Sequence, residues 1–164
     1  MSRDILFKEA DFVFSYRIGG VLLHNGCVLL QRDKNGDYAF PGGHAAALEE
    51  SRDTLVREFW EEARVRIEVG KLMAVGEIFF PWAGRTCHQL ALYYRVQLLN
   101  KDNAGIPLTG SFSFCDLLDG ERFDLEFVWV PLPQLEQLRL YPPQPAAQLQ
   151  SGDDSVLHFV YHEE

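Results

Sequence analysis

Three glutamates stand together on one face of a segment whose periodicity predicts a helix. Glu58, Glu61 and Glu62 are spaced i, i+3 and i+4, so a helix brings their side chains onto a common arc. Like charges at these spacings destabilise a helix by a few tenths of a kcal/mol per pair, and Arg57 neutralises only part of the charge. We therefore expect a cation beside them. Magnesium is the simplest candidate, because it prefers oxygen ligands and bridges carboxylates to substrate phosphates.

The segment before this helix contains a loop suited to close backbone approach. Gly42 and Gly43 follow Pro41 and have no side chains, so a main-chain carbonyl there can ligate a metal and a pyrophosphate group can approach. Glu49 lies in the turn between the loop and the helix. A helix face with three glutamates is also common as a solvated surface in soluble proteins. The adjoining glycine loop favours the metal site over that interpretation.

Together, these residues resemble the signature of the Nudix hydrolases. In that signature, glycine is followed after five residues by glutamate and, after seven more, by the run Arg-Glu-apolar-any-Glu-Glu-any-Gly-apolar. The chain has Gly43, then Glu49 after HAAAL, and after ESRDTLV the run REFWEEARV from Arg57 to Val65. The six charged or glycine positions match by chance at a given start about once in ten million. Arg64 stands where the family usually has glycine, and we expect it to alter the turn after the helix and to leave the carboxylates unaffected.

The resemblance covers most of the chain and implies both a fold and a reaction. Segments Tyr38–Gly43 and Trp129–Leu132 also look like family features. The implied fold is of the α/β class, an α/β/α sandwich around a mixed β-sheet. The implied reaction is hydrolysis of a phosphoanhydride bond in a nucleoside diphosphate linked to another moiety, with Mg²⁺ as cofactor and Mn²⁺ as a substitute. ADP-ribose, other sugar nucleotides, dinucleoside polyphosphates and oxidised nucleoside triphosphates all remain open as substrates.

The resemblance also assigns roles to particular residues. Three carboxylates and one main-chain carbonyl would bind the metal: Glu58, Glu61, Glu62 and either Gly42 or Gly43. Arg57 and Glu49 would form a supporting pair that holds the glutamates in place. Metal ions bound by carboxylates neutralise charge on nonbridging phosphate oxygens and position a water molecule, and phosphoryl transfer requires both.

The base that activates the water is sought outside the helix. Glu126 is the first candidate, because it precedes the apolar run FVWV at the end of a long excursion that we expect to fold over the site. Glu121 and Asp124 are its alternatives. Each of the three carboxylates is equally consistent with a solvated position in a loop.

Aromatic residues are candidates for lining a substrate pocket. Trp82 is the strongest of them, with Phe79, Phe80 and His88 nearby, because aromatic faces stack on nucleobases. Such residues more often belong to the core or the rim of a protein. For His88, a position within a strand with its polar atoms satisfied is the simpler interpretation.

The elements that must position these residues follow from periodicity and turn signals. Asn25-Gly26 predicts the turn of a hairpin between two β-branched and aromatic runs within 12–31. The predicted helix covers 51–64 and buries one apolar arc, formed by Leu55, Val56, Phe59, Trp60 and Ala63. Further strands are expected at 67–69, 72–80, 88–99, 126–130 and 156–161, a short helix at 131–140 that Pro142-Pro143 ends, and loops at 33–43 and 100–125.

Length and charge narrow the remaining possibilities. The chain has 164 residues, 47% of them hydrophobic, so we expect one domain over residues 1–164 with a single core. The formal net charge of −9 opposes long nucleic acid or an anionic membrane as the main partner. No signal peptide or membrane-spanning stretch is evident, so a cytoplasmic location is expected. Cys27, Cys87 and Cys115 are expected to be free thiols.

Two other functions are compatible with the same fold. A catalytically silent sensor of nucleotide metabolites would have no need to keep repulsive carboxylates, and no added DNA-binding segment is evident. An isoprenoid diphosphate isomerase would require a cysteine near the carboxylates, and Cys27 and Cys87 leave that role open. The complete glutamate signature favours the hydrolase. Its expected partner is a small nucleotide, and an exposed edge strand would allow the chain to form a homodimer.

Overall fold

The computed structural model describes the backbone of residues 3–99, 107–118 and 121–164, and side chains throughout these ranges except at 114–118 and 121–124. The strands are β1 (Leu6–Lys8), β2 (Phe12–His24), β3 (Cys27–Arg32), β4 (Tyr38–Ala39), β5 (Gly42–His44), β6 (Ile67–Trp82), β7 (Arg85–Leu98), β8 (Ser111–Leu118), β9 (Glu121–Pro131) and β10 (Leu157–His162). The helices are α1 (Ser51–Ala63), the 3₁₀ helix η1 (Leu132–Gln137) and α2 (Gln144–Ser151).

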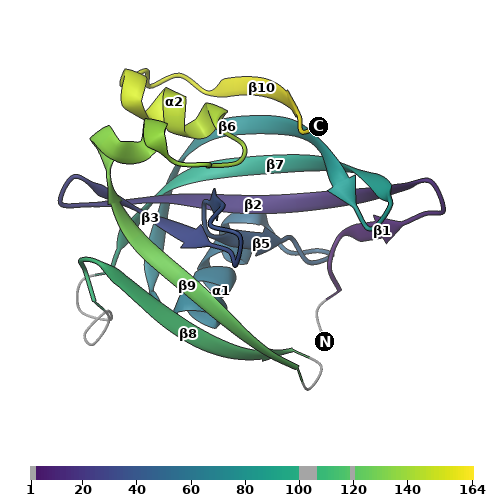
Figure 1. Cartoon of the computed structure of the whole chain (residues 1–164), viewed down its shortest axis with the longest axis horizontal. Coiled ribbons are helices and arrows are strands. Elements are labelled where there is room, and N and C mark those ends of the chain that lie inside the picture. The colour runs from purple at the N-terminus through teal and green to yellow at the C-terminus, as the bar shows by residue number, and fades with distance from the viewer. Residues whose placement is uncertain (1–2, 100–106, 119–120) are drawn as a thin grey trace.

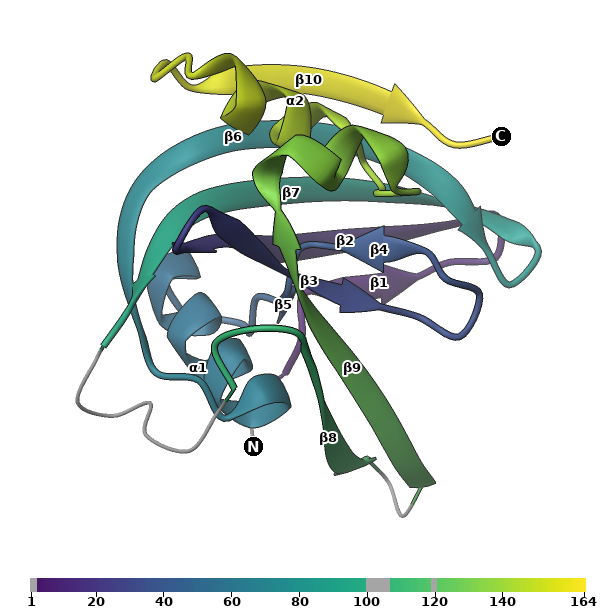
Figure 2. The ribbon, with the colours of Figure 1, turned by 60° about the vertical axis from the view of Figure 1, so that its left-hand side comes forward.

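One mixed sheet runs through the molecule. Its strand order is β10-β6-β7-β2-β3-β9-β8, and the short strands β1 and β5 pair with β2 while β4 pairs with β3. β10 is parallel to β6 and β2 is parallel to β7, whereas the remaining pairs are antiparallel. Figures 1 and 2 show α1 on one side of the curved sheet and η1 with α2 on the other. The expected α/β/α sandwich around a mixed sheet is confirmed.

Two hydrophobic clusters, one on each face of the sheet, replace the single core expected from the sequence. Strand β2 contributes Ile18 and Leu22 to the cluster that contains Leu55 and Phe59 of α1. It contributes Val21 to the cluster that contains residues of η1 and α2. Because neighbouring side chains of a strand point to opposite faces, one long strand serves both clusters.

The hairpin predicted at Asn25-Gly26 is confirmed. Asn25 and Gly26 have φ values of 51° and 75°, the left-handed conformation that a two-residue hairpin turn requires at both positions. The turn pairs Leu23 with Val28 and His24 with Cys27. Near its middle, at residues 17–19, β2 pairs with β5 and so positions the glycine loop at the edge of the site.

Helix α1 has the predicted start and a narrower apolar face than predicted. Leu55, Phe59 and Ala63 are buried, whereas Val56 and Trp60 are 43% and 36% exposed. The expectation that all five residues face the core was wrong for these two. A helix that covers one face of a sheet buries a stripe of residues spaced three or four apart, and positions beside that stripe reach solvent.

Arg64 does not alter the turn after α1, contrary to expectation. Its φ of 55° is the left-handed conformation that glycine would adopt at this position. The Arg64 N–H donates to the Trp60 carbonyl at 3.1 Å, and the Val65 N–H donates to the Phe59 carbonyl at 3.2 Å. The Arg64 guanidinium lies 5.1 Å from the centre of the Trp60 ring. This stacking is consistent with an arginine at a cap position that glycine usually occupies.

The surface excursion expected at 100–125 is instead largely a hairpin. Strands β8 and β9 pair antiparallel from Ser111 opposite Val128 to Leu118 opposite Glu121. The strand expected at 126–130 therefore begins five residues earlier, at Glu121. The turn residues and isolated apolar residues of this segment give no clear strand pattern in the sequence. Strand β9 is stabilised by pairing with β3, which is distant in the sequence. Residues 100–106 lie outside the described part of the chain.

Two smaller expectations also change. Segments 67–69 and 72–80 form one strand, β6, with an irregular register between Val69 and Ala74. Strands β6 and β7 are joined by a turn at Ala83 and Gly84, which have φ values of 48° and 81°. Helix α2 was not predicted, and Pro143 is its N-cap, so the proline pair precedes a helix rather than ending one.

Cys27 and Cys87 are free thiols as expected, and the side chain of Cys115 is outside those described. The buried Cys87 thiol donates to the Ser15 hydroxyl at 3.7 Å, and burial raises its pKa. In the described ranges, no helix has both the length and the apolar character needed to cross a membrane.

Candidate active site

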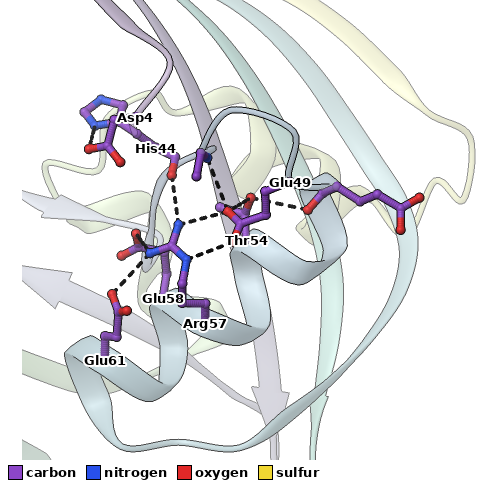
Figure 3. Close-up of polar contacts among 9 residues, drawn as sticks. Asp4, His44, Glu49, Thr54, Arg57, Glu58 and Glu61 are labelled. Atoms are coloured by element: carbon purple, nitrogen blue, oxygen red, sulfur yellow. Dashed lines mark hydrogen bonds and ion pairs between the residues drawn. The ribbon is translucent and has the colours of Figure 1, made fainter. Parts of the chain in front are cut away.

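Arg57 is the centre of a hydrogen-bonded network at α1 (Figure 3). Its Nε donates to Glu49 Oε2 at 2.9 Å and its Nη2 donates to Glu49 Oε1 at 3.0 Å, which makes a bidentate pair. Glu49 also accepts hydrogen bonds from the Thr54 hydroxyl at 2.7 Å and from the Ala46 N–H at 3.2 Å. These donors, Arg57 foremost, lower the pKa of Glu49 to about 2. Glu49 therefore ties the loop before the helix to the helix itself.

The same guanidinium reaches two of the helix glutamates. Nη1 of Arg57 donates to Glu58 Oε1 at 2.8 Å and to Glu61 Oε2 at 3.2 Å. Nη2 donates to the His44 carbonyl at 3.3 Å. The hydrogen bonds to Glu49 are the main cause that raises the pKa of Arg57, so this side chain stays charged. Arg57 and Glu49, paired in the sequence interpretation, are in direct contact.

Glu58 is the most enclosed carboxylate of the network. Its side chain is 12% exposed, against 50% for Glu61. A Cβ atom on Gly43 would lie 2.2 Å from Glu58 Cδ, and one on Gly42 would lie 1.9 Å from the Ile18 carbonyl oxygen. Only glycine fits at these two positions, and the β5 backbone therefore lies against the carboxylate. Burial raises the pKa of Glu58, and Arg57 opposes that rise.

The acidic residues suit a divalent cation in the chemistry of their oxygen ligands. Glu58 and Glu61 share Arg57 as a partner, and Glu62 is hydrogen bonded to Glu58. Carboxylate oxygens are the ligands that Mg²⁺ and Mn²⁺ prefer. Among the described side chains, those of residues 3–99, 107–113 and 125–164, no three His, Cys, Asp or Glu residues surround one point, and the Arg57 guanidinium bridges Glu58 and Glu61. Glycine at 43 keeps the main chain in contact with the Glu58 carboxylate, as a main-chain ligand requires.

Glu126 does not occupy the loop in which the sequence analysis located it. It lies within β9, directly opposite Arg32 of β3, and its carboxylate forms an ion pair with the Arg32 guanidinium. Arg32 also donates to the Tyr38 hydroxyl at 3.3 Å. Its alternatives Glu121 and Asp124 are in the same strand, and their side chains are outside those described. Strand pairing with β3 explains the difference, because it converts an expected loop carboxylate into a cross-strand partner.

A cavity of about 220 Å³ lies on the face of the sheet opposite α1. Its lining includes Arg17, Phe80, Gln89, Tyr93, Tyr141 and Glu163. Trp82, expected to line a substrate pocket, is not part of this lining, and its ring centre lies 6.1 Å from that of Phe80. Phe79 and His88 stack on each other with ring centres 4.4 Å apart and do not line the cavity either. Of the four aromatic candidates, the structure places Phe80 there.

The cavity and the glutamate network lie at the two ends of one short segment. Ala39 of β4 lines the cavity, and Gly43 of β5, four residues later, contacts Glu58. Four residues of extended chain span roughly 13 Å. Arg17 makes a second link, because it lines the cavity, donates to the Phe40 carbonyl at 2.9 Å and lies opposite His44 in the ladder.

The sequence analysis missed the polar residues of the cavity. Gln89 and Tyr93 lie on the same face of β7 as buried Ala91, because alternate residues of a strand share a face. The sequence contained one signal for Gln89. It lies an even number of positions away from buried residues of β7 such as Ala91, so its side chain shares their face. Arg17, a cation within the apolar run of β2, was a second such signal.

Comparisons with known proteins agree with the residue signature. A model of the NUDIX domain family matches residues 14–150. The MutT protein of Methanosarcina mazei is 18% identical, with coverage of 90% of this chain and 100% of that chain and a TM-score of 0.60. An ADP-ribose pyrophosphatase from Streptococcus suis is 15% identical, with 88% and 98% coverage and a TM-score of 0.57. A NUDIX hydrolase from Nitrosomonas europaea is 17% identical, with 91% and 79% coverage and a TM-score of 0.61.

Because the solved structures have such low sequence identities, their similarity to this chain shows only the fold. The match to the family model shows common ancestry with that family. The match covers the glycine loop, α1 and the residues that Arg57 joins. Members of this family generally use a divalent metal. The chain belongs to the Nudix family and is a Nudix hydrolase.

Proposed function

We propose that this hydrolase cleaves a phosphoanhydride bond in a nucleoside diphosphate linked to another moiety, with Mg²⁺ as its cofactor. The observation that carries the proposal is the Arg57 network, which gathers Glu49, Glu58 and Glu61 beside Gly43. The substrate is anionic and the chain has a net charge of −9, so a bound cation is needed to bridge the two.

The metal would be held by oxygen ligands of α1 and β5: Glu58, Glu61, Glu62 and a main-chain carbonyl of Gly42 or Gly43. Mn²⁺ has similar ligand preferences and would replace Mg²⁺. When bound, the ion neutralises charge on nonbridging phosphate oxygens and lowers the pKa of a bound water.

Arg57 and Glu49 have positioning roles in this proposal. The bidentate contact with Glu49 fixes the guanidinium, and the guanidinium then fixes the carboxylates of Glu58 and Glu61. Without Arg57, the like charges along the helix would repel one another and turn toward solvent. Gly42 and Gly43 have no side chains, so the β5 backbone can lie against the Ile18 carbonyl and the Glu58 carboxylate.

The pairing of Glu126 with Arg32 supports a structural role for Glu126 over proton transfer. The Arg32 guanidinium engages the Glu126 carboxylate across the β3–β9 strand pair. The pair would join β3 to β9. A pH–rate profile of Glu126→Gln with the shape of the wild-type profile supports this role, and loss of one limb of the profile would restore Glu126 as the base.

The cavity is the proposed site for the nucleoside part of the substrate. Its aromatic side chains Phe80 and Tyr141 suit stacking on a base, and the segment from Ala39 to Gly43 leads from there to the glutamates. Trp82 packs beside Phe80, so we assign it support of that ring in place of direct base contact.

The experiment is a substrate panel scored by product, with Mg²⁺ and with a chelator. The panel contains ADP-ribose, UDP-linked and GDP-linked sugars, dinucleoside polyphosphates and oxidised nucleoside triphosphates. The ADP-ribose pyrophosphatase and a UDP-X diphosphatase among the structural neighbours make the first two groups natural members of the panel. We expect a nucleoside monophosphate plus a phosphorylated partner, or a monophosphate plus pyrophosphate, only when Mg²⁺ is present.

A sensor without catalytic activity is the alternative that the same panel tests. Tight binding of a nucleotide with no turnover under any metal condition would replace the hydrolase proposal by the sensor. Turnover in the presence of the chelator would instead contradict the metal requirement.

A further inference from the structure

The floor of the cavity carries three polar side chains in one small area. Gln89 and Tyr93 are on the same face of β7, with Ala91 between them. Arg17 of β2 lies directly opposite Ala91 in the parallel ladder. All three polar side chains line the cavity.

Two of these groups are deeply buried and have no protein partner. Gln89 is 6% exposed and Tyr93 is 2% exposed. Within the described part of the chain, neither the Gln89 amide nor the Tyr93 hydroxyl has a hydrogen-bond partner, and neither is sealed from the cavity. Buried polar side chains in folded proteins nearly always have a hydrogen-bond partner, either in the protein or in ordered water. These two groups face the cavity, so a ligand there can form hydrogen bonds with them.

Arg17 and Glu163 add a cation and an anion to the same cavity. One N–H of Arg17 donates to the Phe40 carbonyl, and its other N–H groups have no described acceptor. Glu163, just after β10, also lines the cavity and forms no ion pair with Arg17 among the described residues. A guanidinium can only donate hydrogen bonds, whereas a carboxylate can only accept them. A ligand that satisfies both needs acceptors on one edge and donors on another.

The walls of the cavity include aromatic side chains. Phe80, Tyr141 and Tyr161 line the cavity, and aromatic faces stack on nucleobases of any sequence. Such walls suit a planar heterocycle whose edge meets the polar floor.

We propose that the cavity selects a guanine base, or another 6-oxopurine, over adenine. This inference rests on the proposed function and names its substrate class. Arg17 would donate to O6 and N7, the pairing that arginine makes with guanine in nucleic-acid recognition. Gln89 and Glu163 would accept from N1–H and the 2-amino group. Adenine presents an amino donor where guanine presents O6, so Arg17 would face a second donor at that position and keep only N7 as an acceptor.

The test is calorimetric binding of GMP and AMP to the full chain, with a chelator and no metal. We expect wild-type protein to bind GMP at least about tenfold more tightly than AMP. In Gln89→Met, which keeps side-chain volume and removes the amide, we expect the ratio to fall below about threefold. Gln97→Met is the matched control, because Gln97 is an exposed glutamine of the same strand, and it should keep the wild-type ratio.

A second variant guards against an effect on folding. Glu163 is exposed at the end of the chain, so Glu163→Gln should fold normally and still reduce the preference for GMP. Equal affinity for GMP and AMP in wild-type protein would overturn the inference. The same ratio in wild type, Gln89→Met and Glu163→Gln would overturn it too.

Hydrolysis measured in parallel separates this inference from the proposed function. With Mg²⁺, guanosine and adenosine versions of one nucleotide sugar are compared by kcat/KM. Turnover of both at equal kcat/KM, with equal binding of GMP and AMP, removes the base preference and keeps the hydrolase. Preferential binding of GMP without hydrolysis of either sugar keeps the base preference and removes the proposed function.

Discussion

The polar groups on the two faces of the sheet differ in whether the protein itself supplies their hydrogen-bond partners. On the α1 face, Arg57 is bonded to carboxylates of Glu49, Glu58 and Glu61 and to one carbonyl. On the cavity face, the Gln89 amide and the Tyr93 hydroxyl have no hydrogen-bond partner in the described part of the chain, and both side chains line the cavity. The polar groups of the α1 face are therefore bonded within the protein, whereas these two groups of the cavity face are available to a ligand.

The largest effect should come from the carboxylates of the α1 face. Glu61→Gln and Glu62→Gln should each lower kcat at least about a hundredfold at saturating Mg²⁺, because each removes a charge that we assign to metal binding. Steady-state rates on the best substrate of the panel provide the measurement. Glu68→Gln, an exposed glutamate in β6, should keep wild-type rates. Near-normal rates in both helix variants would remove these glutamates from the site.

A smaller effect, on stability and on rate, is expected at Gly43, where the β5 backbone contacts the Arg57 network. Gly43→Ala should lower the free energy of unfolding by about 1–3 kcal/mol, because a Cβ there would lie 2.2 Å from Glu58 Cδ and force the carboxylate to move. Urea denaturation gives the stability, and kcat should fall with it. A variant with unchanged stability and rate would mean that the contact between β5 and Glu58 is not needed.

On the cavity face, burial of Tyr93 predicts a pH dependence of stability. Burial raises the pKa of Tyr93 to about 12 from an ordinary value of 10.0, so the folded protein holds this proton more tightly than the unfolded chain. The resulting stability is complete below pH 10 and is lost as the pH rises toward 12, by an amount on the order of 1–2 kcal/mol.

The measurement is urea denaturation of wild type and Tyr93→Phe between pH 9 and 12. The Tyr93→Phe variant should lose less stability over this interval, because it has no phenol to ionise. Parallel pH curves for the two proteins would show that another group controls the alkaline transition. Tyr16 and Tyr161, whose pKa values are also raised chiefly by burial, are the next tyrosines to substitute.

The smallest expected effect is a gain in stability instead of a loss, and it tests the contrast between the two faces of the sheet. Gln89→Met should leave the ligand-free protein as stable as wild type or more stable by up to about 1 kcal/mol, because it removes an unpaired buried amide. Thermal denaturation without nucleotide gives the comparison. A clear loss of stability would show that the protein itself satisfies the Gln89 amide, and the contrast between the two faces would no longer hold.

The features predicted correctly are those that depend on neighbours in sequence. The turn at Asn25-Gly26 follows from two residues that tolerate positive φ, and α1 follows from apolar residues three and four apart. Contact between Arg57 and Glu49 joins residues eight positions apart, within reach of one turn and the start of one helix. Glu126 was misplaced because its surroundings depend on Arg32, which is 94 positions away.

By itself, the sequence determined the family, the helix with its three glutamates and the glycines beside them, because local spacing specifies all of these. The tertiary structure decided which polar groups are left unpaired and where a substrate base can lie. Arg17, Gln89, Tyr141 and Glu163 come from four distant segments, and strand register and sheet curvature bring them to one cavity. The choice of Phe80 over Trp82 was likewise decided by packing, because both side chains leave the same face of β6 and only one of them lines the cavity.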